Sequence, residues 1–288
     1  MMRKLLTICC TAVEGKPLQW RRNLGMITMD LKAIWKYRLR TNLSVIATIL
    51  SLFCVHFPAT AAVYKAPPIN PDPNKYYLFY MHGGFVETFG DGVRATGNSK
   101  IKISYDYSKI LNKFSARGLE VIGEARRSDV PHGAYAKKIA GQIRSLISSG
   151  VSPSHIVIGG HSKGGQMALL VSAMLGKTNY WNRLRYLIAA SCRIEDRKGG
   201  LTNILKKLKA RGSKMRAGYV FNMYDHNDDM SRSCGYVFKI AEFNKTKEVM
   251  FKEGSGHQLF YQAKDIWIGP AADWIFSSNK LMSDLESD

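Results

Sequence analysis

Five residues in the middle of the chain, Gly160-His161-Ser162-Lys163-Gly164, have the spacing of a nucleophilic serine turn. The apolar run Ile156–Gly160 precedes the serine, and an apolar stretch with helical character, Gly164–Leu175, follows it. A tight turn from strand to helix strains the backbone of the serine and requires small residues on both sides. It also exposes the hydroxyl at a helix N-terminus, where negative charge is favoured. We therefore predict that Ser162 is a nucleophile.

The same glycines have two other interpretations. A Walker-type phosphate loop has the pattern G-x-x-x-x-G-K-[ST]. Counted from Gly159, the second glycine of that pattern would be Gly164, but Gly165 and Gln166 follow it instead of Lys and Ser or Thr. The phosphate loop is thereby excluded, whereas close packing of a helix on a sheet, without catalysis, remains an alternative.

A second motif, His82-Gly83-Gly84, follows the aromatic run Tyr76–Met81. Small residues at a strand end let backbone N–H groups point at a developing oxyanion. The N–H groups of Gly84 and Lys163 would form a hole with two donors, with the N–H of Phe85 as the alternative to that of Gly84. A glycine turn without a catalytic role is the other interpretation.

The elements around these motifs alternate between strand and helix. Strands are predicted at Tyr76–Met81, Leu119–Glu124, Ile156–Gly160, Leu184–Ala190, Tyr219–Tyr224 and Glu248–Phe251. Helices are predicted at Tyr105–Arg117, Ala134–Ser149, Gly164–Leu175, Leu201–Ala210 and Gln258–Phe276, the last broken near Gly269-Pro270. This order is typical of an α/β fold with a mostly parallel, doubly wound sheet. The site then lies beyond the carboxyl ends of the strands.

With these motifs the chain resembles the α/β-hydrolase superfamily over residues 75–276. The matching features are His82-Gly83-Gly84, the Gly160–Gly164 turn, and a late Asp and His in that order. The resemblance implies a Ser–His–acid triad, acyl transfer to water, and neither cofactor nor metal. The chain also resembles a small exported bacterial subgroup at three segments: Ser162–Gln166 (Ser-Lys-Gly-Gly-Gln), Glu124-Ala125-Arg126-Arg127 and Tyr224–Asp228.

The resemblance also directs attention to the base and the acid. The histidine is expected after the last strand, where His257 follows Gly254-Ser255-Gly256. The acid is expected a few residues after the strand Tyr219–Tyr224, which favours Asp228. The alternatives are Asp225 and Asp229, and unused members of this group would cap turns.

Two arginines and two loops complete the predicted site. Arg126 and Arg127 follow a strand and could bind an anionic substrate group, or pair with surface carboxylates such as Glu124 or Asp129. The connection Ser191–Gly200 is too short for the lid that many lipases of this fold insert, so we expect a single domain without a large lid. The stretch Phe85–Lys100 is expected to be a longer loop that forms one wall.

Residues 1–61 have the parts of an export signal. Basic residues precede the apolar run Leu43–Phe57, and Ala59-Thr60-Ala61 follows it. We predict a signal peptide, with an uncleaved inner-membrane anchor as the alternative, and therefore a periplasmic protein. Residues 62–74 would be a proline-rich lead-in to a hydrolase domain at 75–288.

Beyond the leader only Cys192 and Cys234 remain, which suggests one disulfide rather than two free thiols.

Composition limits the functional classes. The chain has 45% hydrophobic and 22% charged residues, which excludes disorder as its main state. Without residues 1–61 the net charge is still +13. This favours an anionic membrane or glycan surface, and no motif for nucleic acid is present.

The first functional hypothesis is thus an exported serine hydrolase that cleaves a carboxylic ester or thioester, small or presented on a surface, through an acyl-enzyme. A peptidase or amidase would use the same triad. A non-catalytic binding protein on a hydrolase scaffold is the hypothesis from a different class.

Overall fold

The computed structural model describes residues 61–94, 103–192, 201–210, 212–231, 233–241, 243 and 245–285. They lie in one unit of the chain, Phe57–Asp288. The predicted signal peptide or anchor lies outside the described residues, apart from Ala61. In the described part of the chain, no helix combines the length and the hydropathy that crossing a membrane would require.

The centre of this unit is a sheet of seven strands in the order β1-β3-β2-β4-β5-β6-β7, and every neighbouring pair is parallel. The strands are β1 (Val63–Tyr64), β2 (Tyr77–Met81), β3 (Glu120–Ile122), β4 (Ile156–His161), β5 (Arg185–Ala189), β6 (Tyr219–Asp225) and β7 (Thr246–Phe251). The predicted parallel sheet is confirmed. Within the predicted lead-in, β1 pairs with β3 at the sheet edge.

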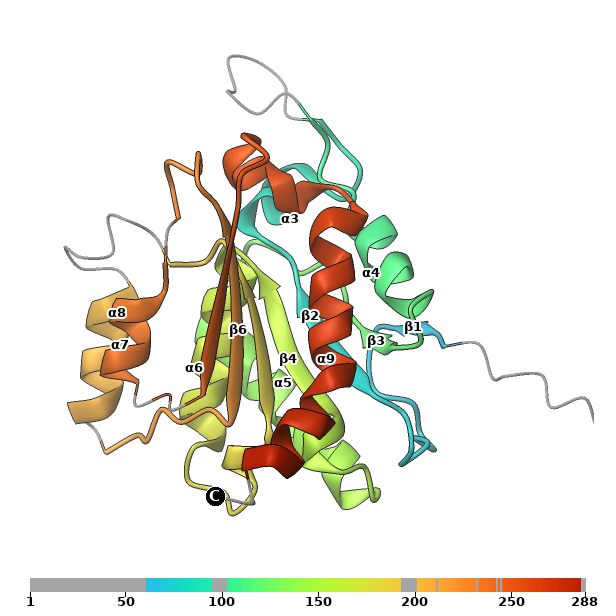
Figure 1. Cartoon of the computed structure of the whole chain (residues 1–288), viewed down its shortest axis with the longest axis vertical. Helices are drawn as coiled ribbons and strands as arrows, with labels where there is room; N and C mark the ends of the chain where they lie inside the picture. Colours follow the sequence, from blue (N-terminus) through green and yellow to red (C-terminus); the bar gives the residue numbers. More distant parts are fainter. Residues whose placement is uncertain are drawn as a thin grey trace, which may run out of the picture. The chain divides into compact units, whose positions relative to one another are not determined.

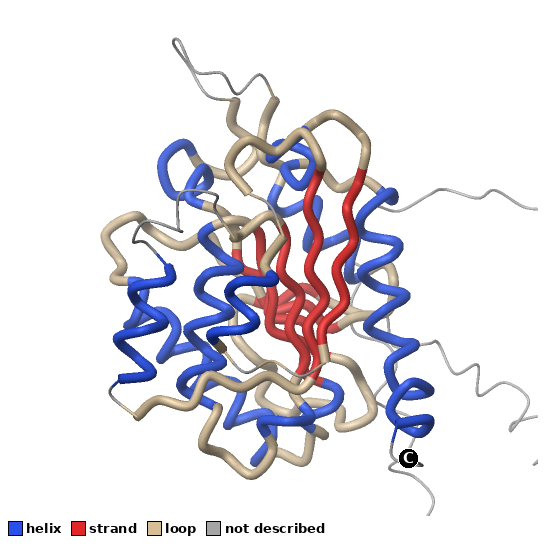
Figure 2. Tube along the Cα trace, turned by 60° about the vertical axis from the view of Figure 1, so that its left-hand side comes forward, coloured by secondary structure: helices blue, strands red, loops and turns tan. Residues whose placement is uncertain are grey.

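Helices cover both faces of the sheet (Figures 1 and 2). They are α3 (Gly84–Phe89), α4 (Tyr107–Ser115), α5 (His132–Ser148), α6 (Lys163–Leu175), α7 (Leu201–Ala210), α8 (Gly235–Ile240) and α9 (Asp265–Leu285), with 3-10 turns η1 (Pro153–His155), η2 (Trp181–Arg183) and η4 (Gly256–Tyr261). Helices α4 and α9 pack on one face, and α5, α6 and α8 pack on the other. The sheet is therefore doubly wound, as predicted.

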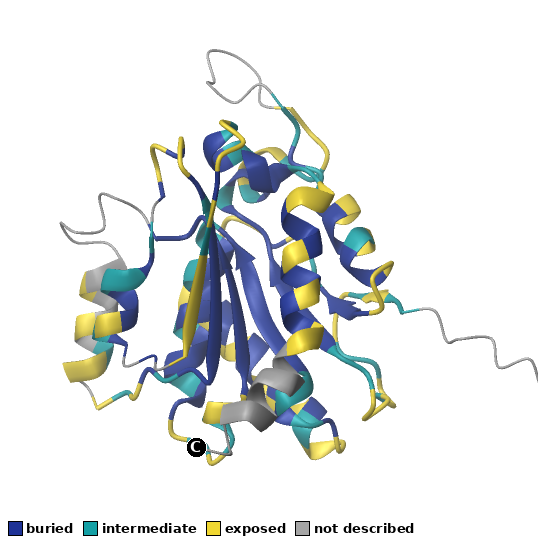
Figure 3. Cartoon of the chain, viewed as in Figure 1, coloured by how far each residue is buried: buried dark blue, intermediate teal, exposed yellow. Residues whose placement is uncertain are grey.

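Strand β2 shows why the sequences of the central strands are continuously apolar. Tyr77, Phe79 and Met81 join the core on the α5–α6 side, whereas Leu78 and Tyr80 join the core on the α4–α9 side. All five residues are buried. A strand between two helical layers has no solvent face, so it lacks the alternation of a half-exposed strand. Figure 3 shows this burial along the central strands.

Two sequence expectations about the elements are corrected. The predicted loop Phe85–Lys100 is not a loop at its start, because residues Gly84–Phe89 form the short helix α3. The C-terminal break lies at residues 262–264 rather than at Gly269-Pro270, because α9 continues through Pro270 and the Trp267 Nε1–H donates to the carbonyl of Gln262. The segment predicted to be too short for a lid lies mostly outside the described residues, at 193–200.

Candidate active site

Ser162 occupies the turn between β4 and α6 in a strained backbone conformation, with φ 55° and ψ −121°. A residue with a Cβ rarely adopts this conformation unless the surrounding structure enforces it. Two hydrogen bonds hold it: the Ser162 N–H donates to Ala189 O (2.8 Å), and the Gln166 N–H donates to Ser162 O (3.1 Å). The turn has the geometry that exposes a nucleophile at a helix N-terminus.

The glycines on either side of this turn are required by close backbone contact. A Cβ on Gly160 would lie 2.3 Å from the carbonyl oxygen of Met81, and one on Gly164 would lie 2.0 Å from the same atom. Neither approach is possible for a side chain, because the blocking atom is backbone. The spacing of small residues in the motif therefore follows from the packing of β4 and α6 against the end of β2.

The turn at His82-Gly83-Gly84 lies directly against the serine. A Cβ on Gly83 would be 3.2 Å from Ser162 Cβ. His82 fixes the turn: its Nδ1–H donates to Gly83 O (2.8 Å), and its Nε2 accepts the backbone N–H of Arg126 (2.6 Å). These partners define a neutral imidazole. Burial, followed by the charge of Arg126, lowers the pKa of His82 to about 4.

The two predicted oxyanion donors begin neighbouring helices. Gly84 is the first residue of α3, and Lys163 is the first residue of α6. First-turn N–H groups have no acceptor within their own helix, so these groups are available to a ligand. Both residues line the cavity that contains Ser162, and so does Phe85.

The structure brings His257 and Asp228 together. His257 lies on η4 with its ring buried, and its Nδ1 is 2.9 Å from Asp228 Oδ2. The other carboxylate oxygen, Oδ1, accepts the backbone N–H groups of Met230 (2.8 Å) and Ser231 (2.9 Å). With Nδ1–H donating to Asp228, the lone pair of His257 Nε2 is left for a proton from the cavity side. The described part of the structure has no hydrogen bond between His257 and Ser162 Oγ. In enzymes without bound substrate such catalytic hydrogen bonds are often long, and they shorten when substrate binds.

The two alternative acids have other positions. Asp225, at the end of β6, is fully buried and accepts backbone N–H groups from Asn227 (2.9 Å), Gly256 (3.2 Å) and Glu253 (3.1 Å). It ties the loop before His257 to the sheet, which is the turn-capping role expected for an unused acid. Asp229 is exposed.

A third histidine, His161, lies behind the serine. It is fully buried, and its ring centroid is 4.5 Å from that of His257. Neither of its ring nitrogens has a hydrogen-bond partner among the described residues. Burial, and then the proximity of His257, holds the pKa of His161 well below its usual range. A neutral ring at this position avoids adding a second positive charge beside His257.

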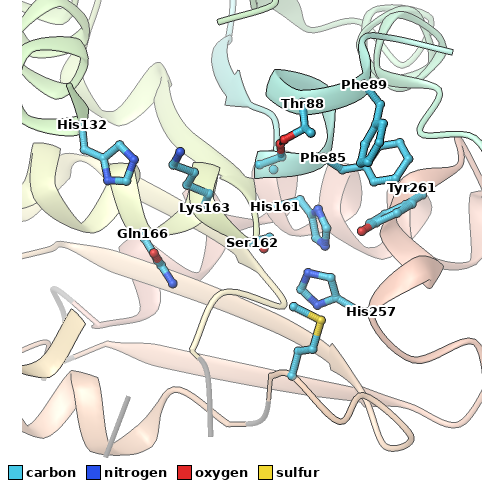
Figure 4. Close-up of a pocket in the computed structure, with 13 residues that line it drawn as sticks. Phe85, Thr88, Phe89, His132, His161, Ser162, Lys163, Gln166, His257 and Tyr261 are labelled. Atoms are coloured by element: carbon cyan, nitrogen blue, oxygen red, sulfur yellow. The ribbon is translucent and has the colours of Figure 1, made fainter. Parts of the chain in front are cut away.

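These groups surround a cavity of about 430 Å³ (Figure 4). Its lining includes Ser162, His257 and His161. The remaining lining residues are Gly83, Gly84, Phe85, Thr88, Phe89, His132, Lys163, Gln166, Met230 and Tyr261. The predicted wall from the Phe85–Lys100 stretch is therefore present, but helix α3 supplies it. In the described part of the chain, no cluster of three His, Cys, Asp or Glu side chains could hold a metal ion.

Beside the cavity lies an ion cluster that the sequence did not reveal. Glu87 of α3 pairs with both Lys163 and Arg126, and Arg126 Nε is 2.7 Å from its Oε1. Burial alone would raise the pKa of Glu87, but hydrogen bonds and charge from the two cations lower it below its ordinary value. Nothing in the local sequence indicates this cluster, since its members are 39 and 76 residues apart in the chain.

The structure gives Arg126 and Arg127 roles other than the predicted contact with substrate. Arg126 is buried behind the cavity, where it pairs with Glu87 and donates to His82 O (3.2 Å). Arg127 is exposed and pairs with Asp129. Neither side chain lines the cavity at Ser162. The surface alternative, pairing with Asp129, holds for Arg127.

The predicted disulfide between Cys192 and Cys234 is present. Cys192 follows β5, and Cys234 precedes helix α8. The bridge closes a loop that includes β6 and Asp228. It therefore limits the freedom of the segment that presents the acid to His257.

Comparison with known proteins gives structural matches only. No protein-family profile matches the chain, and no curated protein matches its sequence. An esterase from the fungus Rhizomucor miehei superimposes with a TM-score of 0.50 at 11% identity, over 73% of this chain and 77% of the esterase. Esterase B from Lactobacillus rhamnosis gives 0.48 at 14% identity, over 76% and 82%.

The parallel sheet with helices on both faces, and the serine turn at the end of β4, define the α/β-hydrolase fold, and this chain has that fold. At such low identity the likeness establishes the fold alone. The narrower resemblance, to a small exported bacterial subgroup, stays a prediction.

Proposed function

We propose that the protein is an exported serine hydrolase that cleaves a carboxylic ester or thioester. One observation carries the proposal: Ser162 is held in a strained, partly exposed turn and lines the same cavity as His257, which is hydrogen-bonded to Asp228. Three groups from distant segments must converge to give this arrangement. Ordinary packing does not require it.

The proposed mechanism has two acyl transfers. Ser162 Oγ attacks the carbonyl carbon while its proton passes to His257 Nε2, and the oxyanion receives hydrogen bonds from the N–H groups of Gly84 and Lys163. Collapse of the intermediate breaks the bond to the leaving oxygen or sulfur, which takes the proton from His257. Water then attacks the acyl-serine ester by the same steps, which releases the acid and restores Ser162.

Asp228 orients His257 and stabilises its imidazolium in this mechanism. Asp225 has a positioning role, because two of its three backbone contacts, to Glu253 and Gly256, hold the loop that precedes His257. Two features support export: the leader pattern in residues 1–61 and the Cys192–Cys234 disulfide, which is typical of oxidising compartments. The basic charge of the remaining chain favours an anionic surface near the substrate.

The first test is covalent labelling with a fluorophosphonate probe. We expect wild-type protein to be labelled and Ser162→Ala not to be. Ser154→Ala, a change on the surface turn η1, is the matched control and should label normally. Wild-type protein that is folded but unlabelled would overturn the hydrolase proposal in favour of a binding protein.

The second test separates the two acids. Asp228→Asn should lower kcat for an aryl ester by about 10⁴, because the wrong histidine tautomer is then favoured. Asp225→Asn should mainly lower stability. A larger fall in kcat for Asp225→Asn would refute the assignment. Comparing an aryl ester with the corresponding anilide then tests ester against amide cleavage.

A further inference from the structure

The cavity has two walls of different chemistry, with Ser162 between them. Figure 4 shows the polar wall on one side, and the aromatic wall, together with His257, on the other. The polar wall consists of His132, Lys163 and Gln166, and the aromatic wall consists of Phe85, Phe89 and Tyr261. A substrate that fills the cavity therefore meets unlike surfaces at its two ends.

The polar wall carries excess positive charge. Lys163 and Arg126 share the single carboxylate of Glu87, so the three groups together have a net charge of +1. The side chain of Lys163 is 28% exposed, whereas those of Glu87 and Arg126 are 4% and 1% exposed. Of the three residues only Lys163 lines the cavity, so a substrate group meets the net charge of the cluster at Lys163.

No carboxylate opposes this charge from the cavity itself. None of the described residues in its lining is Asp or Glu; Glu87 is neutralised by its two cationic partners, and Asp228 is hydrogen-bonded to His257. Two helix N-termini strengthen the effect: α6 begins at Lys163, and the 17-residue helix α5 begins at His132. Burial and the charge of Lys163 lower the pKa of His132, which makes its ring a neutral donor or acceptor there.

We infer that the substrate is an ester whose acyl part carries a carboxylate or another anionic group, held at the wall of His132, Lys163 and Gln166. The inference rests on the proposed function. The acyl part is assigned to this wall because the leaving oxygen must reach His257, which lies on the opposite side of Ser162 (Figure 4). The aromatic wall then receives the alcohol part.

The test compares two substrates of nearly equal shape: the 4-nitrophenyl half-ester of adipic acid and the 4-nitrophenyl ester of adipamic acid, in which a carboxamide replaces the carboxylate. Rates are corrected for uncatalysed hydrolysis. Charge-assisted hydrogen bonds exceed neutral ones by enough to give about tenfold or more in kcat/KM. We expect that preference for the half-ester, and we expect it to shrink as salt rises.

Variants locate the origin of the preference. Lys163→Gln keeps the backbone N–H and brings the cluster to neutrality, so the ratio of the two kcat/KM values should fall close to one. Glu87→Gln leaves both cations unopposed and should raise the ratio. Lys109→Gln is the matched control: it removes the same charge on α4 outside the cavity, and the ratio should stay unchanged.

The outcomes separate this inference from the proposed function. If the probe labels Ser162 and the half-ester has no advantage, the inference is wrong and the hydrolase proposal stands. An anion preference only on the alcohol side, seen with 3-acetoxybenzoate against 3-acetoxybenzamide, overturns the assigned orientation. Failure of both labelling and hydrolysis removes the proposed function and the inference together.

Discussion

Replacement of Ser162 by glycine should make the protein more stable than replacement by alanine. At φ 55° and ψ −121°, backbone strain destabilises a residue with a Cβ by about 1–3 kcal/mol, whereas a glycine is not strained there. Glycine loses more chain entropy on folding, about 0.5–1 kcal/mol relative to alanine. The difference leaves Ser162→Gly about 1 kcal/mol more stable than Ser162→Ala.

Urea unfolding of both variants measures this difference, since both lack the serine hydroxyl and differ only in the Cβ. Ser172, inside the same helix α6, provides the control, because its backbone is helical and its hydroxyl donates to Leu169 O (2.7 Å). There the glycine variant should be about 1 kcal/mol less stable than the alanine variant. Equal signs at the two positions would show that the turn stores no strain, and the structural reason for a poised nucleophile would be lost.

Three further predictions concern stability and can be measured by unfolding. The pKa of His82 falls from 6.5 unfolded to about 4 folded, so stability is complete above about pH 6.5 and decreases as pH falls toward 4. Between pH 7.5 and 5.5 the loss from this residue is about 1.3 kcal/mol, and unfolding curves that are independent of pH would contradict it. Reduction of the Cys192–Cys234 bridge, which spans 42 residues, should cost about 2–4 kcal/mol, and equal midpoints with and without reductant would contradict this. Gly164→Ala should prevent stable folding, whereas Gly141→Ala, with open space around it on α5, should stabilise by about 1 kcal/mol; similar behaviour of the two would refute the packing argument.

The features predicted well from sequence are those fixed by local constraints. The serine turn needs glycines at set distances because Gly160 and Gly164 both approach Met81 O, and such a requirement is visible as spacing. The sheet is visible because strands buried on both faces are continuously apolar. The resemblance to the superfamily favours Asp228 among three candidate acids, and in the structure Asp228 is the one hydrogen-bonded to His257.

The features missed depend on contacts between distant segments. The sequence leaves open whether Arg126 binds substrate or pairs with a nearby surface carboxylate, whereas its partner in the structure is Glu87, which lies on another element. Glu87 itself could not be singled out, because the six residues of α3 are too few for a helical period to show. The neutral state of His82 likewise depends on the backbone of Arg126, 44 residues away.

Helix α3 has a consequence for how new specificity could evolve. The same six residues supply the predicted oxyanion donor Gly84, two of the three aromatic-wall residues and the carboxylate of Glu87, so a mutation there that changes selectivity also risks the rate. Among the described lining residues that are exposed and lie on a helix, only His132, on α5, belongs to a helix that carries none of the proposed catalytic groups. Substitutions at position 132 are therefore expected to change the substrate range with the smallest loss of catalytic rate.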